Sequence, residues 1–149
     1  MVEKAQCYSI GYGNRSFDDF VQMLVENRIT HLVDIRRYPQ STFDDFNKES
    51  LQSSLPLYNI IYIHCEGVGG MRDSTYIEYM GTGEFRKSFS HLLACINSVN
   101  EKGGRVVLMC AEKNPKDCHR RYLAQHLEQS GIKVIHLTEP GQIDLCSFS

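Results

Sequence analysis

The segment Cys110–Arg121 holds the side chains best suited to chemistry in this sequence. It reads Cys-Ala-Glu-Lys-Asn-Pro-Lys-Asp-Cys-His-Arg-Arg, with one thiol where a strand is expected to end and a second where a helix is expected to begin. The partial positive charge at a helix N-terminus favours a thiolate. A carboxylate and an imidazole in the same segment are potential proton donors and acceptors. We therefore take Cys110, Glu112 and His119 as the candidate catalytic residues.

Anion binding is the second chemistry that the sequence suggests. Backbone amides at a helix N-terminus, together with guanidinium groups, can hold a phosphate or a carboxylate. Arg120 and Arg121 are adjacent on the expected helix, so they cannot both face one pocket. One of the two is expected to pair with Asp34 or Glu112, because a buried charge is costly without a partner. The candidate substrate-binding or anion-binding residues are Asp34, Arg36, Ser41, Arg72, Cys118 and Arg120.

The thiols also have simpler interpretations. Cys110 and Cys118 are both suited to packing in the core, because reduced cysteine is commonly buried. Cys110, Cys118 and His119, with His64 or Cys65, would make a zinc site, but the offset from Cys110 to Cys118 is no standard ligand spacing. The six cysteines include no CxxC pair, and we assign no metal ligand. No pattern identifies a cofactor, since the glycines of Gly67–Gly70 do not form a nucleotide-binding signature.

Alternating strands and helices are expected to position these residues. Short apolar runs predict the strands, and Arg105–Cys110 is apolar on both faces, as in a buried parallel sheet. Helical spacing and capping residues predict the helices, with caps at Ser16, Asn47, Thr82 and Asp117. The expected strands are Cys7–Gly11, Thr30–Ile35, Tyr58–His64, Arg105–Cys110 and Lys133–Leu137, and the expected helices follow Ser16 and Thr82 and cover Lys48–Leu55, Tyr76–Met80 and Cys118–Gln129.

This order of elements predicts a single three-layer α/β domain over residues 1–149. Its sheet should be mostly parallel, with about five strands and helices on both faces, because strands joined by helices form right-handed crossovers. The tail after residue 140 has little periodicity and is expected to be loose. Loops at the carboxyl ends of the strands converge. Asp34, Arg36, Cys110, Glu112 and His119 are therefore expected around one concavity at that edge.

Composition limits the classes of function. The chain has 149 residues, of which 42% are hydrophobic and 23% charged, and this argues against a disordered chain. With a net charge of −2, the chain as a whole lacks the excess of basic residues typical of nucleic-acid-binding domains. A local basic patch would still be enough to bind nucleic acid. No apolar run approaches the roughly 18 residues of a membrane span. The first residues carry no apolar signal region, so we expect a cytoplasmic protein without membrane contact.

Several of these motifs together resemble a bacterial and archaeal family, domain of unknown function 488. The similarity covers about residues 8–136, and one departure is Tyr12, where many members have histidine. The resemblance implies a fold type and a set of motifs, but no reaction. The motifs are Gly11-Tyr-Gly-Asn-Arg-Ser16, Val33–Arg36 with Pro39 and Ser41, Gly69-Gly70, Tyr79-Met80, Cys110–Lys113 and Cys118–Arg121.

A weaker resemblance is to rhodanese-like domains. Val33–Arg36 is similar to their Asp-x-Arg strand end, and Val106–Cys110 is similar to the strand before their catalytic cysteine. The resemblance implies that Cys110 carries a persulfide. The loop after Cys110 is longer than in rhodaneses, and its Glu112 would raise the pKa of a nearby thiol.

Three functional hypotheses follow. The first is an enzyme that acts on a phosphate-bearing or nucleotide-like small molecule, which Arg36 and Arg120 hold. The second is a non-catalytic module that binds nucleic acid or a protein partner through the same edge. The third is rhodanese-like sulfur transfer through Cys110. The sequence predicts neither a particular substrate nor an oligomeric state.

Overall fold

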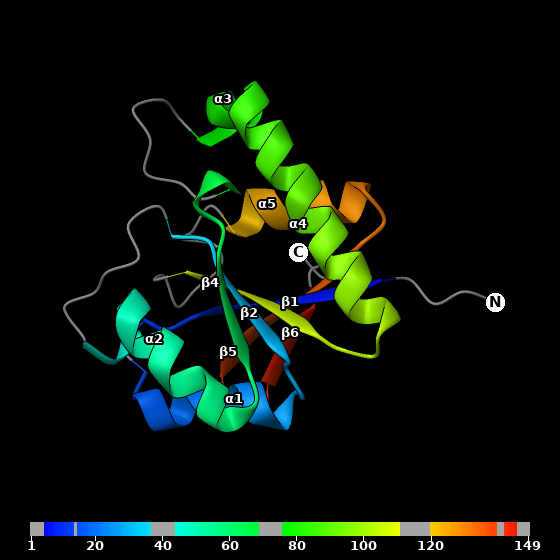
Figure 1. Ribbon diagram of the computed structural model, residues 1–149. Coiled ribbons are helices and arrows are strands. Elements are labelled where there is room, and N and C mark those ends of the chain that lie inside the picture. The colour runs from blue at the N-terminus through cyan, green and yellow to red at the C-terminus, as the bar shows by residue number, and fades with distance from the viewer. Residues whose placement is uncertain are drawn as a thin grey trace.

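A single sheet in the order β3-β2-β4-β1-β5-β6 forms the centre of the computed structural model (Figure 1). The structure describes residues 5–13, 15–36, 44–68, 76–110, 120–139 and 142–145. Strands β1 to β5 are parallel, and β6 pairs antiparallel with β5. The predicted α/β fold with a mostly parallel sheet is thereby confirmed. The strands are β1 (Gln6–Gly11), β2 (His31–Asp34), β3 (Ile61–His64), β4 (Val106–Cys110), β5 (Lys133–Glu139) and β6 (Gln142–Leu145).

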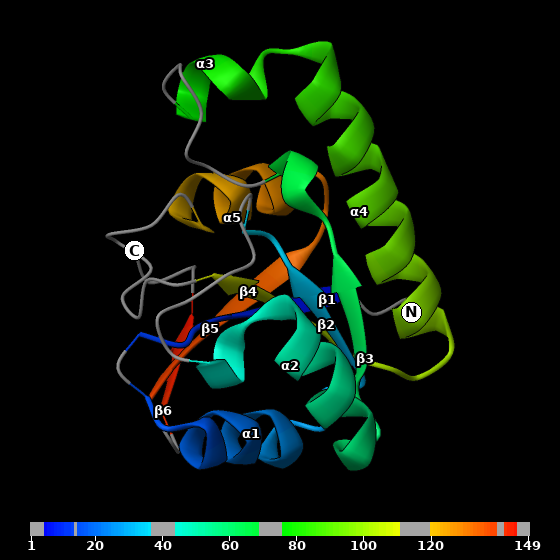
Figure 2. The same cartoon turned by 60° about the vertical axis from the view of Figure 1, so that its left-hand side comes forward.

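Helices cover both faces of the sheet, as expected (Figure 2). Helices α1 and α2 pack on one face, where Phe20 and Leu51 join an apolar cluster with Leu32 and Met109 of the strands. Helices α4 and α5 pack on the other face. The helices are α1 (Phe17–Glu26), α2 (Lys48–Ser54), α3 (Tyr76–Met80), α4 (Gly83–Glu101) and α5 (Arg120–Gln129), and 3₁₀ turns cover Asp44–Phe46, Leu55–Tyr58 and Glu66–Val68.

Strand β4 lies in the middle of this sandwich, and all five of its residues are buried. Side chains alternate between the two faces of a strand. Leu108 and Cys110 therefore belong to the cluster beneath α4 and α5, whereas Val107 and Met109 belong to the cluster beneath α1 and α2. This alternation determines which side of the sheet each residue of the candidate site occupies.

Two of the predicted caps are confirmed. Ser16 Oγ accepts from the amide of Asp19, and Thr82 Oγ1 accepts from the amide of Phe85, so each satisfies an amide that has no partner within its helix. Asn47 occupies the N-cap of α2, but its side chain makes no capping hydrogen bond. The predicted cap Asp117 lies outside the described residues.

Two expected elements differ in the structure. The third strand begins at Ile61 rather than Tyr58, because residues 55–58 continue α2 as a 3₁₀ turn, which Asn59 ends with a positive φ of 63°. The tail was expected to be loose, yet residues 142–145 form β6 along the edge of β5. Of the helices in the described ranges, none is long and apolar enough to span a bilayer.

Candidate functional site

The carboxyl end of β4 is the point where the chain connections diverge. Its neighbours β1 and β2 lead into α1 and α2 on one face of the sheet, whereas β4 leads to α5 on the other face (Figures 1 and 2). The amide of Tyr12 donates to the Cys110 carbonyl at 3.1 Å, and the amide of Ile35 donates to the Met109 carbonyl at 3.1 Å. The two flanking chains are thus still hydrogen-bonded to β4 at its last two residues. In open α/β sheets, ligands bind at the carboxyl ends of the strands where the connections diverge in this way.

A buried ion pair lies beside this point, between Asp34 at the end of β2 and Arg36 two residues later. Arg36 Nε donates to Asp34 Oδ1 at 2.9 Å, and Arg36 Nη2 donates to Oδ2 at 2.7 Å. The backbone amide of Arg36 also donates to Oδ1, at 3.1 Å. Asp34 is fully buried, and Arg36 is 7% exposed. This two-point contact orients the guanidinium more precisely than a single bond would.

Aromatic and imidazole groups complete the surroundings of the ion pair. The Tyr62 hydroxyl donates to Asp34 Oδ2 at 2.5 Å, and Arg36 Nη1 donates to the Tyr12 hydroxyl at 3.4 Å. His64 Nε2 lies 2.7 Å from the Arg36 carbonyl oxygen. The Tyr12 ring stacks on Phe46, with centroids 4.5 Å apart and planes 15° apart.

Two pKa values respond to this environment. Burial alone would lower the pKa of Arg36, but the hydrogen bond and charge of Asp34, aided by Tyr12, raise it overall. Burial raises the pKa of Tyr62, and the hydrogen bond to Asp34 and its negative charge raise it further. The guanidinium is therefore charged and the phenol neutral throughout the ordinary pH range.

Cys110 lies at the same end of the sheet as Asp34 but on the opposite face. Asp34 pairs in register with Met109, the residue before Cys110. Cys110 is 2% exposed and packs in the cluster beneath α4 and α5, whereas the Asp34–Arg36 pair contacts Tyr12 and Tyr62 on the other face. Asp34 and Cys110 share the expected edge, but they do not face one concavity, because the one-residue offset in register reverses the side-chain direction. Glu112 and His119 of the predicted set lie outside the described residues.

We predicted that Arg120 or Arg121 pairs with Asp34 or Glu112. Arg36 occupies both carboxylate oxygens of Asp34. Glu112 lies outside the described residues, so its pairing stays a prediction. Arg121 is exposed, and its Nη2 donates to the Tyr122 hydroxyl at 2.6 Å. Arg120 begins α5. The other predicted site residues, which lie outside the described ranges, are Ser41, Arg72, Glu112, Cys118 and His119.

Sequence reasoning did not identify Tyr62 as a partner of Asp34. The available signal was its place two residues before His64, which pairs in register with Asp34. That offset puts the tyrosine diagonally across from the carboxylate on the same face of the sheet, within reach of a long side chain. This signal can be read from the sequence only when the pairing of β2 with β3 is already known.

Within the described ranges, no three histidine, cysteine, aspartate or glutamate side chains are placed to hold a metal ion. Two members of the zinc alternative, Cys118 and His119, lie outside those ranges.

Comparison with known proteins identifies one family. The family model described as "Domain of unknown function DUF488" matches residues 16–127. No curated protein and no solved structure matches the chain. The rhodanese-like resemblance gains no support from any comparison. The match to the family model spans most of the chain, from α1 into α5, so this protein belongs to the DUF488 family.

Proposed function

We propose that the edge around the end of β4 binds a phosphate-bearing or nucleotide-like small molecule. The observation that carries the proposal is the Arg36 guanidinium, which Asp34 holds in place at the point where the chain connections diverge. A buried and oriented guanidinium loses little conformational entropy when it binds a planar or tetrahedral anion.

Arg36 retains hydrogen-bonding capacity for such an anion. A guanidinium has five N–H donors. Nε and one N–H of Nη2 donate to Asp34, and one N–H of Nη1 donates to Tyr12. Within the described part of the chain, one N–H on Nη1 and one on Nη2 therefore remain available for a ligand.

The proposed chemistry uses the segment that connects β4 with α5. Glu112 and His119 follow β4 in the chain before α5 begins, and we assign them the proton-transfer roles in a reaction on the bound molecule. Cys110 is a weaker candidate for attack on that molecule, because its side chain packs on the other face of the sheet at 2% exposure. The net charge of −2 gives no support to the alternative of nucleic-acid binding.

Calorimetric titration with AMP, ATP and inorganic phosphate tests the proposal. We expect saturable binding of at least one of the three, weakened at least tenfold by Arg36→Lys, because lysine keeps the charge but loses the planar fork. Arg105→Lys is the matched control. Arg105 lies just before the opposite end of β4, where its Nη1 donates to the Asn27 carbonyl at 3.0 Å.

Three results would count against the proposal. They are no binding of any of these compounds, equal weakening by Arg105→Lys, and binding of a single-stranded DNA oligonucleotide that falls steeply with salt. The last result would favour the nucleic-acid alternative. Circular dichroism of both variants establishes that each is folded before titration.

A further inference from the structure

Strand β3 forms one edge of the sheet and has backbone groups that point away from it. The Ile61 amide donates to the Thr30 carbonyl, and the Cys65 amide donates to the Asp34 carbonyl, both at 2.9 Å. Backbone groups alternate in direction along a parallel ladder. The N–H and C=O groups of Tyr62 and His64 therefore face outward, and no strand in the described part of the chain pairs with them on that side.

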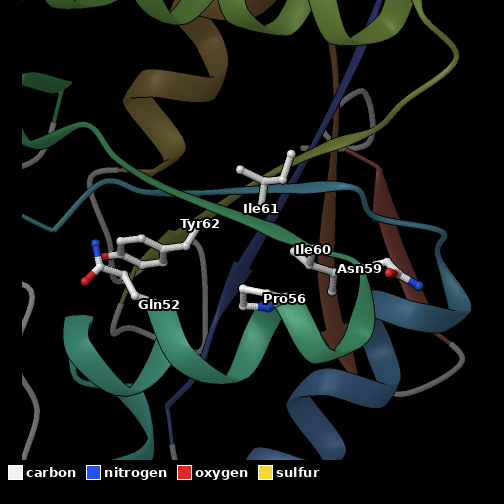
Figure 3. Close-up of a pocket in the computed structure, with 6 residues that line it drawn as sticks. All are labelled: Gln52, Pro56, Asn59, Ile60, Ile61 and Tyr62. Carbon is white, nitrogen blue, oxygen red and sulfur yellow. The ribbon is translucent and has the colours of Figure 1, made fainter.

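Two grooves flank this edge, one on each face of the sheet. The groove on the α2 side has a volume of about 560 Å³ and is lined by Gln52, Pro56 and Tyr62 among others (Figure 3). The groove on the α4 side has a volume of about 370 Å³, and its lining includes Ile63 and Cys95. Consecutive side chains of a strand point to opposite faces. An extended segment paired with β3 would therefore direct its side chains alternately into the two grooves.

The surface around the edge is unusually apolar for a solvent-facing region. Leu57 is 81% exposed, Ile61 is 55% exposed and Tyr58 is 43% exposed. Figure 3 shows Ile61 projecting from β3 on the side opposite Tyr62. Exposed edge strands in proteins are usually protected by charge, proline or a covering segment. The four residues of β3, Ile-Tyr-Ile-His, carry no Lys, Arg, Asp, Glu or Pro.

We propose that β3 binds an extended peptide segment of a partner protein, which adds a strand to the sheet between the layers of α2 and α4. Backbone bonds to Tyr62 and His64 supply affinity, and the two grooves select apolar side chains at alternate positions. This site uses the outer backbone edge of β3, whereas the small-molecule site uses the Arg36 guanidinium, and Tyr62 contacts both through its backbone and its hydroxyl.

The arrangement favours a peptide over a second folded copy. Figure 2 shows β3 with α2 on one side and α4 on the other. A second copy paired through its own β3 would also bring its own α2 and α4, and these helices would compete for the space beside α2 and α4 of the first copy. A single extended segment brings no such layers.

Charge defines the chemistry of the partner further. Lys102 and His31 both line the groove on the α4 side. Burial and the nearby Lys102 charge lower the pKa of His31, so a negative charge in this groove would be favourable to both residues. The expected partner is therefore an extended segment that is apolar at alternate positions and has one acidic side chain facing α4.

Selection from a phage-displayed library of random octapeptides against the full-length chain tests the proposal. We expect enrichment of sequences with this pattern. A synthetic copy of the most enriched peptide should bind at least tenfold more weakly to Ile61→Lys and to Lys102→Glu. Val25→Lys is the matched control, because Val25 is an apolar residue of α1 with 52% exposure, away from β3, and its replacement should leave the affinity unchanged.

Amide hydrogen exchange gives a second readout that is independent of the library. Bound peptide should slow exchange at Tyr62 and His64 at least tenfold, because these amides become donors to the new strand. The Ile63 amide already faces β2 and should change much less.

Failure to enrich any peptide would overturn the proposal, as would binding that Ile61→Lys leaves intact or that leaves exchange at Tyr62 and His64 unchanged. Sedimentation equilibrium tests whether a second copy of the chain occupies this edge instead. A dimer of the wild-type chain that Ile61→Lys dissociates would assign the edge to a second copy and overturn the peptide assignment.

Discussion

The Tyr62 hydroxyl donates a hydrogen bond of 2.5 Å to Asp34 Oδ2, and this bond ties the edge strand β3 to the ion pair beside β4. It completes four hydrogen bonds to this carboxylate, together with the three from the side chain and backbone of Arg36. A carboxylate has about four acceptor sites. Asp34 is thus saturated by protein donors, and its role is to position the groups around it.

Removal of the Asp34 charge should destabilise the fold strongly. Asp34→Asn leaves the Arg36 guanidinium buried without its counter-ion, so we expect a loss of about 3–5 kcal/mol in the free energy of unfolding. Urea denaturation measures this loss. The double variant Asp34→Asn/Arg36→Met should be more stable than Asp34→Asn alone, because it buries no unpaired charge. Exposed Asp45 provides the control, with Asp45→Asn expected to change stability by no more than about 0.5 kcal/mol. A similar small change for Asp34→Asn would contradict the interpretation.

The hydroxyl of Tyr62 should have a stability effect that depends on pH. Tyr62→Phe removes a hydrogen bond to a charged group and should cost about 1.5–3 kcal/mol at neutral pH. The pKa of Tyr62 is raised in the folded state. Its stabilising contribution is therefore fully present below the unfolded value of about 10 and is lost as pH rises above that value. The difference between the wild type and Tyr62→Phe should shrink as pH rises above about 10.

Denaturant titrations between pH 7 and pH 11 provide that measurement. Tyr58→Phe is the matched control, because Tyr58 is 43% exposed in the 3₁₀ turn before β3 and should show little effect at any pH. A constant difference for Tyr62→Phe across this range would show that the folded protein does not hold this phenol neutral.

Gly67 should not tolerate a side chain. A Cβ atom at this position would lie 2.5 Å from Ser88 Cβ of α4 and would overlap its hydroxyl oxygen. We expect overpacking in Gly67→Ala to lower the free energy of unfolding by about 1–3 kcal/mol, and therefore to lower the melting temperature. Gly83→Ala is the control, since nothing lies within 4 Å of a Cβ added there. The double variant Gly67→Ala/Ser88→Gly removes the overlap and should regain part of the lost free energy of unfolding. The recovery is incomplete because a glycine within a helix costs roughly 1 kcal/mol. An unchanged melting temperature for Gly67→Ala would contradict the close contact.

Cys110 should react slowly with alkylating agents while the protein is folded. Cys110 and Cys7 are buried, at 2% and 0% exposure, whereas Cys95 is only partly buried. Burial raises the pKa of Cys7 strongly, so this residue is an internal reference for an inert thiol. With iodoacetamide at pH 8, we expect Cys95 to be modified more than tenfold faster than Cys110 by peptide mass spectrometry. Faster modification of Cys110 than of Cys95 would restore Cys110 as the leading candidate nucleophile.

The sequence by itself determined the succession of elements and the edge of the sheet at which the candidate site lies. Apolar runs with period 2 and helical stripes are local signals, so the strand at Arg105–Cys110 and the capped helix after Thr82 were predicted to within a residue or two. The carboxyl ends of parallel strands share one edge, which placed Asp34 and Cys110 at the same end of the sheet. Strand β6 was missed because a segment of four residues is too short to show a clear periodic pattern, and its pairing with β5 is not visible in the sequence.

Only the tertiary structure decided which residues meet at that edge. Face and partner depend on register, and one residue of offset between Asp34 and Cys110 places their side chains on opposite faces of the sheet. Tyr62 reaches Asp34 across 28 residues of sequence because β3 pairs with β2. Strand order and register are properties of the whole assembled sheet, and no local pattern in the chain encodes them.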